Sequence, residues 1–456
     1  MCYNLCFSVA MLTPIFRLEQ TDTVLRVIIH APMAKLGDLE VCVEFNQFFF
    51  TATPYYLRFE LPGPVFTGEE TFSVEFQNGD FVVGLKKMKP EYYKDLDLIT
   101  KLLNPSTKQS RSNVGLIEEI QDSVAADVPT QDSTLDWFSP STYDLCDFVN
   151  SEQNETEVLL TPPCYGFCGS KSGLFQSESD LTYVVCLPHP DKVSPKKRST
   201  LRLSEEKRKF SAQHYLADFF ESESYQSMLK FRPPWRSADA LPDGMELTDE
   251  ERHRLIVLSS RRLPHLSGDL YEVVSLYLGL ADLLLAHSYD LRVREGEEMT
   301  ESGWNIAKLS ATLSWFEVFH NLPDLLITFY RRALVFPLVR SWRFCTRVRT
   351  DVAVLLQSEH AKSWCLKCLL EIRRLLIAYP GYHVYTDLYL DDYIVWIQTR
   401  AKEDHLHSLG IELQKYNIRK ESVGLDLLDV EQLGKRCLQA EQLTEDVGRL
   451  TMTENV

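Results

Sequence analysis

The spacing of apolar residues changes along the chain, and this change limits the folds that it can adopt. From about residue 11 to 90, apolar and polar residues alternate with period two in short runs, among them LEVCVEF (39–45), YLRFEL (56–61) and FSVEF (72–76). From about residue 206 to 440, apolar residues recur with helical spacing instead. The sequence therefore predicts a multidomain α and β protein, with a β domain over 11–90 and an all-α domain over 206–440.

Turn residues separate the alternating runs of the N-terminal part. They include Pro54, the Pro62–Gly63–Pro64 corner and Asn78–Gly79–Asp80. Several short alternating strands with such turns between them are typical of an antiparallel β-sandwich. Asn78–Gly79 is a good two-residue hairpin turn because both residues tolerate positive φ.

The region between the two domains, residues 91–205, has no clear periodicity. From Ser112 to Ser170 it contains no Lys or Arg, while Asp and Glu accumulate. Such a stretch cannot bury enough apolar surface to offset its ordering entropy, which predicts an acidic, largely disordered linker. Near its end, Lys196–Lys197–Arg198 has the composition of a nuclear-localisation signal, with a solvated helix entry as the alternative.

Helix start signals mark the C-terminal part. We expect Ser204 to cap a helix that begins with EEKRKF, and Thr248 with Glu251 to form a capping box. Ser310 is a good N-cap for ATLSWFEVFHNL, whose apolar residues cover nearly every direction around a helix. Such a helix is normally buried, so we interpret it as part of the core, with a partner-binding face as the alternative.

The charge balance limits the kinds of partner. The formal net charge is −17 and the pI is about 5.2. Polyanion binding depends on Lys and Arg neutralising phosphates, so this balance argues against a general RNA or DNA binder and favours a basic protein partner. The apolar stretch 273–289 carries Asp282 at its middle, which favours a buried helix over a membrane span.

No familiar catalytic arrangement is found in the sequence. It lacks a Gly-rich phosphate loop, a G-x-S-x-G elbow and an H-E-x-x-H motif. Cys365-x-x-Cys368 lies in an apolar helical pattern without a second pair, and structural zinc needs four ligands. Asp387, Asp391 and Asp392 are better explained as caps or partners of basic residues than as an acid–base pair. We therefore predict a protein that is not an enzyme and has no metal or cofactor.

Several segments resemble, in order along the chain, the Shq family of H/ACA ribonucleoprotein assembly factors. MLTPIF (11–16) and PYYLRFELPG (54–63) are similar to the family's CS domain, a β-sandwich related to small heat-shock proteins. The following segments resemble its helical Shq-specific domain: HYLADFF (214–220), LLAHSYDLRVREGE (284–297), ESGWNIAKLSATLSWFE (301–317), RRALVFPLVRSW (331–342) and DLYLDDYIVWIQ (387–398).

The resemblance implies a non-enzymatic chaperone. It would bind the pseudouridine synthase of the H/ACA particle, dyskerin in animals, before RNA does, and cover part of the RNA-binding surface of that synthase. Release would involve AAA+ ATPases, without direct contact to nucleic acid or membrane, in the nucleoplasm and cytoplasm. The alternative is that the CS domain makes the chain an adaptor of the major ATP-dependent heat-shock chaperone.

Residues for the partner surface can be named only as a hypothesis. Those that we expect there lie within the matched segments, and each could instead be internal scaffolding. They are Asp218, Phe219, Glu221, Asp290, Arg292, Glu295, Glu297 and Trp304.

Overall fold

The computed structural model divides the chain into two compact units, which are described separately below. It describes residues 11–44, 46–67, 72–77, 79–104, 138, 163–175, 184–237, 245–336 and 338–439. Within this part, residues 11–104 and 245–260 form the β-rich unit, and the remaining described residues form the helical unit.

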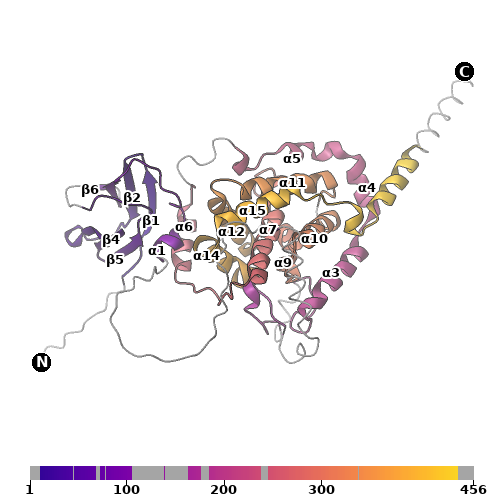
Figure 1. The fold of residues 1–456 in the computed structure, drawn as a ribbon, viewed down its shortest axis with the longest axis horizontal. Coiled ribbons are helices and arrows are strands. Elements are labelled where there is room, and N and C mark those ends of the chain that lie inside the picture. Colours follow the sequence, from indigo (N-terminus) through magenta and orange to yellow (C-terminus); the bar gives the residue numbers. More distant parts are fainter. Residues whose placement is uncertain are drawn as a thin grey trace, which may run out of the picture. The chain divides into compact units, whose positions relative to one another are not determined.

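Two antiparallel sheets make up most of the β-rich unit (Figure 1). One sheet has the strand order β1-β2-β7-β6 and the other β3-β4-β5. The strands are β1 (Ile15–Gln20), β2 (Val24–His30), β3 (Glu40–Glu44), β4 (Gln47–Ala52), β5 (Tyr55–Glu60), β6 (Phe72–Gln77) and β7 (Asp80–Lys86). The predicted β-sandwich is thus confirmed, including the alternation of buried and exposed residues along β5.

Aromatic rings fill the space between the two sheets. The Phe16 and Phe59 rings stack with centroids 5.0 Å apart, and Phe50 meets Phe81 edge-on at 5.2 Å. Gln77 pairs with Asp80 across the β6–β7 hairpin, where Gly79 has a φ of 91°. The strand pairing and the positive φ of Gly79 agree with the two-residue turn that the sequence predicts, whose Asn78 lies outside the described residues.

Two short helices extend the sandwich unit beyond the predicted residues 11–90. They are α1 (Ile99–Leu103) and α6 (Asp249–Leu258), joined by a hydrogen bond from Thr100 Oγ1 to the Leu255 carbonyl. The backbone N–H of Met245 donates to Asp97 Oδ2 at 2.8 Å. Residues 245–260 therefore belong with the sandwich, not with the helical unit to which the sequence assigned them.

The capping box of α6 is confirmed. Thr248 Oγ1 accepts from the backbone N–H of Glu251, and the Glu251 carboxylate accepts from the N–H of Thr248. Two of the N–H groups that a helix start leaves without partners are satisfied in this way.

The helical unit is built around α7 (Leu270–Val293), which runs through its middle (Figure 1). By length and composition α7 could cross a membrane, but 72% of its most apolar window is buried, as the sequence led us to expect of a core helix. The other helices are α3 (Pro195–Lys209), α4 (Ala212–Phe220), α5 (Gln226–Lys230), α8 (Ser302–Leu309), α9 (Ala311–Ser314), α10 (Leu322–Val335), α11 (Trp342–Leu356), α12 (Ala361–Ile377), α13 (His383–Tyr385), α14 (Asp391–Thr399) and α15 (Glu403–Lys415), with a π-helical turn over Thr386–Leu390.

The sequence placed the start of the helical region too late. Helix α3 begins at Pro195 with Ser194 as its N-cap residue, so Ser204 lies inside the helix and caps nothing. Residues 163–175 and 184–194 also pack in the helical unit, where Tyr165 and Phe167 are buried. Most of the acidic stretch itself lies outside the described residues.

Candidate partner-binding site

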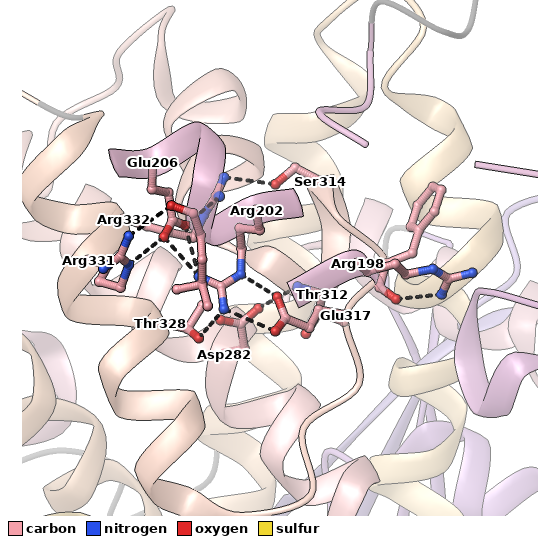
Figure 2. A network of polar contacts seen from close by, with 12 residues as sticks. Arg198, Arg202, Glu206, Asp282, Thr312, Ser314, Glu317, Thr328, Arg331 and Arg332 are labelled. Atoms are coloured by element: carbon pink, nitrogen blue, oxygen red, sulfur yellow. Dashed lines mark hydrogen bonds and ion pairs between the residues drawn. The ribbon is translucent and has the colours of Figure 1, made fainter. Parts of the chain in front are cut away.

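A buried network of charges ties α3 to α10 (Figure 2). The carboxylate of Glu206, with no exposed surface, pairs with Arg202 at 2.9 Å, Arg331 at 2.8 Å and Arg332 at 3.3 Å. Nε and Nη2 of Arg202 also donate to the two carboxylate oxygens of Glu317. Burial alone would lower the pKa of Arg202, but Glu317 and Glu206 raise it. Because three arginines share two carboxylates that are themselves fully paired, the network holds the helices in place rather than offering a reactive group.

The same network explains why the predicted helix after Ser310 is wrong in length. Ser310 caps it as expected, but α9 ends at Ser314, and Phe316 has a φ of 52°. The Phe316 carbonyl accepts from Arg198 at 2.7 Å, and Glu317 pairs with Arg202. The core assignment is confirmed for Trp315 and Phe316, each at most 2% exposed, whereas Val318 is 48% exposed.

Two of the residues proposed for the partner surface are internal. Asp290 is fully buried and Arg292 is 1% exposed. Asp290 accepts from Arg294 at 3.1 Å and from Asn305 at 3.2 Å, while Arg292 pairs with Asp351. These side chains join α7 to α8 and α11, so the prediction that they contact a partner is wrong for both. The sequence contains no sign of this burial, because Asp and Arg side chains are usually exposed and nothing in the residue type marks the buried ones.

The loop that follows α7 presents carboxylates to solvent. We call it the acidic loop; its exposed members are Glu295, Glu297, Glu298 and Glu301. The sequence prediction named the first two and missed Glu298 and Glu301, although the run EGEEMTE contains all four. In this loop the predicted partner-binding residues Glu295 and Glu297 are accessible to solvent, and both are acidic.

Arg294 binds the backbone of the acidic loop. Its guanidinium donates to the Gly296 carbonyl at 3.1 Å and the Glu297 carbonyl at 2.8 Å, and it pairs with Glu371. The turn itself needs left-handed backbone at Glu295 and at Gly296, where φ is 50° and 88°. A loop bound in this way presents its carboxylates from a fixed backbone, which reduces the entropy lost on binding a partner.

Glu371, the partner of Arg294, has a lowered pKa. Burial alone would raise the pKa of Glu371, but the hydrogen bond with His287 and the charge of Arg294 lower it to about 2. His287 Nε2 lies 2.9 Å from Glu371 Oε2. The carboxylate therefore stays ionised at neutral pH and keeps Arg294 oriented toward the loop.

Trp304 lies in the first turn of α8, just after the acidic loop. It is half-buried, with neighbours Gly303 and Asn305 buried. A Cβ at Gly303 would lie 2.7 Å from the Leu375 carbonyl, so α8 packs against α12 there. Trp304 thus combines a fixed backbone with a partly accessible ring.

The three candidates from the end of α4 lie in a different setting. Asp218 accepts from the backbone N–H of Arg340 at 2.7 Å, and the half-buried Phe219 ring has Lys420 and Lys435 within 6 Å of its centre. These contacts connect parts of the helical unit to one another and so have a structural role. Glu221 is exposed, and it is the member of this group that is available to a partner.

The remaining sequence candidates for chemistry have structural roles. Arg261 pairs with Asp392 at 2.5 Å, and Arg373 pairs with Asp391 at 2.8 Å, as the simpler interpretation predicted. Cys365 and Cys368 are buried, and burial raises the pKa of both thiols. Among the described residues, no group of three His, Cys, Asp or Glu could hold a metal ion.

One residue of the basic cluster is also internal. Arg198 is 1% exposed and donates to the Phe316 and Cys164 carbonyls, whereas Lys196 and Lys197 are exposed on the first turn of α3. The cluster is therefore a helix entry with one structural arginine in the folded unit, which favours the alternative to a localisation signal.

Comparison with known proteins finds one family with two described domains in this chain. Residues 237–427 match the family described as SHQ1 protein, Shq1 domain, and residues 13–103 match the SHQ1-like CS domain. The chain is 35% identical to the SHQ1 homolog of Xenopus tropicalis over 95% of this chain and 71% of that protein. It is 30% identical to shq1 of Schizosaccharomyces pombe, covering 92% of this chain and 96% of the yeast protein. The chain belongs to the Shq1 family.

The boundaries of the two Shq1 family matches differ from those of the units, since the Shq1-domain match also includes α6 of the β-rich unit. The CS match ends at residue 103, so it includes α1, and the Shq1-domain match includes the whole acidic loop and Trp304. Among solved structures, heat shock protein 16.0 from Schizosaccharomyces pombe aligns with 18% of this chain and 94% of its own, with 15% identity and a TM-score of 0.16, which supports no further argument.

Proposed function

We propose that this member of the Shq1 family is an assembly chaperone for box H/ACA ribonucleoproteins. It would bind the pseudouridine synthase subunit, dyskerin in animals, before RNA and cover its RNA-binding surface. Family membership is the observation that carries this proposal. Release by AAA+ ATPases and residence in nucleoplasm and cytoplasm are parts of the same proposal.

The geometry favours the acidic loop as part of the binding surface. An RNA-binding surface is basic because it neutralises phosphates. The loop offers several exposed carboxylates on a backbone held by Arg294, with the partly accessible ring of Trp304 following it. Carboxylates in such an array can take the place of phosphates, and the net charge of −17 would speed the encounter with a basic partner.

A competition experiment with the full chain tests this function. The synthase is immobilised, loaded with the chain, and challenged with H/ACA RNA; the order of addition is then reversed. We expect each ligand to exclude the other from the synthase. A stable complex containing the chain, the synthase and H/ACA RNA at the same time would contradict the proposal that the chain covers the RNA-binding surface.

The alternative function rests on the CS match over residues 13–103. Under it, the chain would connect the major ATP-dependent heat-shock chaperone to a client, and the synthase would not be bound directly. Binding of the purified chain to the synthase in the absence of any other chaperone separates the two functions. Retention of the heat-shock chaperone without direct synthase binding would favour the adaptor.

A further inference from the structure

A cluster of positive charge lies on the helical unit, in a chain that is acidic overall. Lys230 ends α5 and Arg232 follows this helix, while Arg343 and Arg347 lie one turn apart on α11; all four are exposed. None of the four forms an ion pair within the part of the chain that the structure describes. Like charges at this helical spacing repel each other, so the cluster is not explained by internal pairing.

These cations line two open hollows that share part of their lining. The first, of about 550 Å³, is lined by residues that include Trp342, Arg343 and Thr346, and the second, of about 610 Å³, by residues that include Arg232 and Trp235. Leu229, Lys230 and Arg347 line both hollows. We call the combined feature the basic groove.

The floor of the basic groove is fixed by buried ion pairs. Arg236 pairs with Asp351 at 2.8 Å, and Arg292 binds the other oxygen of the same carboxylate. Arg292 also donates to the Met228 carbonyl at 2.7 Å, which anchors α5. Burial lowers the pKa of Arg236, and the neighbouring Arg347 and Arg232 lower it further, in agreement with a surplus of positive charge here.

We infer that the basic groove binds an extended acidic peptide of a partner protein, with Asp or Glu side chains on the exposed cations and apolar side chains over Leu229 and Trp342. Charge complementarity identifies the occupant, because exposed cations that form no ion pair among the described residues attract anionic side chains. Two adjoining hollows with partly apolar lining fit a peptide better than a single small anion. A nucleic acid is disfavoured because a net charge of −17 repels a long polyanion. This surface has the opposite sign to the acidic loop, and the inference does not depend on the proposed function.

Fluorescence anisotropy with the full chain tests the inference. The probe is a fluorescein-labelled peptide of about twelve residues in which glutamates alternate with leucine and serine, and its counterpart has glutamine for every glutamate. We expect the Arg343→Glu/Arg347→Glu variant to bind the probe at least about tenfold more weakly than the unaltered chain, because attraction becomes repulsion. The glutamine peptide should bind the unaltered chain as weakly.

The matched control is Lys196→Glu/Lys197→Glu on α3, which makes the same change in charge with exposed residues outside the groove. It should bind the probe within about twofold of the unaltered chain. Thermal melting verifies folding, and Arg343→Gln/Arg347→Gln replaces the groove variant if charge reversal prevents folding.

Three results would overturn the inference. The first is equal probe binding by the groove variant and the unaltered chain. The second is displacement of the probe by a single-stranded RNA at lower concentration than by unlabelled acidic peptide, which would make the groove a nucleic-acid site. The third is probe binding about tenfold tighter after deletion of residues 112–162, which would mean that the acidic stretch of this chain is the occupant.

Discussion

Single charged side chains have two distinct roles in the helical unit. Glu206 is enclosed by Arg202, Arg331 and Arg332, whereas its neighbour Glu205 pairs with Arg208 and Lys209 near the surface. A buried carboxylate compensates cations that cannot reach water, while a surface pair competes with solvent at little net gain. Adjacent residues of the same type should therefore differ greatly in their contribution to stability.

Replacing Glu206 by Gln should lower the free energy of unfolding by about 3–5 kcal/mol, because three buried guanidinium groups lose their shared carboxylate. Urea unfolding followed by circular dichroism measures the change. Glu205→Gln is the matched control and should cost less than about 1 kcal/mol. Equal losses for the two variants would show that the buried network does not support the fold.

Glu371 provides a test of pH dependence. Its folded pKa of about 2 lies below the ordinary 4.5, so its ionisation stabilises the fold above pH 4.5 and this contribution disappears as the pH falls toward 2. Glu371→Gln should thus lose on the order of 3 kcal/mol at pH 7, and the difference from the unaltered chain should shrink between pH 5 and about 3. Urea unfolding at several pH values measures this difference. A constant difference across that range would contradict the assigned role of His287 and Arg294.

At the scale of elements, close approach between α7 and α14 depends on Gly279. A Cβ there would lie 2.3 Å from the Tyr393 hydroxyl, which donates to the Leu276 carbonyl. Alanine normally stabilises a helix by about 1 kcal/mol relative to glycine. We expect Gly279→Ala to destabilise by about 1–3 kcal/mol instead, because the methyl group and the hydroxyl cannot share the space.

A double-mutant cycle identifies the cause of that effect. Tyr393→Phe removes the hydroxyl that the new methyl group would meet, so Gly279→Ala should cost clearly less in the Tyr393→Phe background, as measured by thermal unfolding. Additive losses would place the clash elsewhere.

Some boundaries of helices and strands could be predicted from the sequence, and others could not. Period-two alternation predicted the strands, and local capping signals predicted the starts of α6 and α9. The end of α9 could not be predicted, because it depends on Arg198 and Arg202, which are more than a hundred residues away in the sequence. The burial of Asp290 and Arg292 was missed because it depends on the packing of α7 against α8 and α11, which residue types alone do not indicate. The exposed Glu295 and Glu297 follow α7 in a turn that EGE suggests locally.

At the scale of the whole molecule, the chain enters the helical unit and then returns to the β-rich unit, to which it adds α6. Its Leu255 and Leu258 are buried, and its Leu255 carbonyl accepts from Thr100. A fragment that begins at residue 105 should keep α7 protected from hydrogen exchange and lose protection in α6. Exchange measured by mass spectrometry checks this, and unchanged protection of α6 would contradict its assignment to the β-rich unit.

The central claim is that carboxylates of the acidic loop bind the synthase, and one titration tests it most directly. The affinity of the full chain for the purified synthase is compared between Glu295→Lys/Glu297→Lys and the control Glu403→Lys/Asp404→Lys, which reverses two exposed carboxylates of α15. We predict that the loop variant binds at least about tenfold more weakly at an unchanged melting temperature, while the control binds within about twofold of the unaltered chain. Equal affinities for the two variants would contradict the claim.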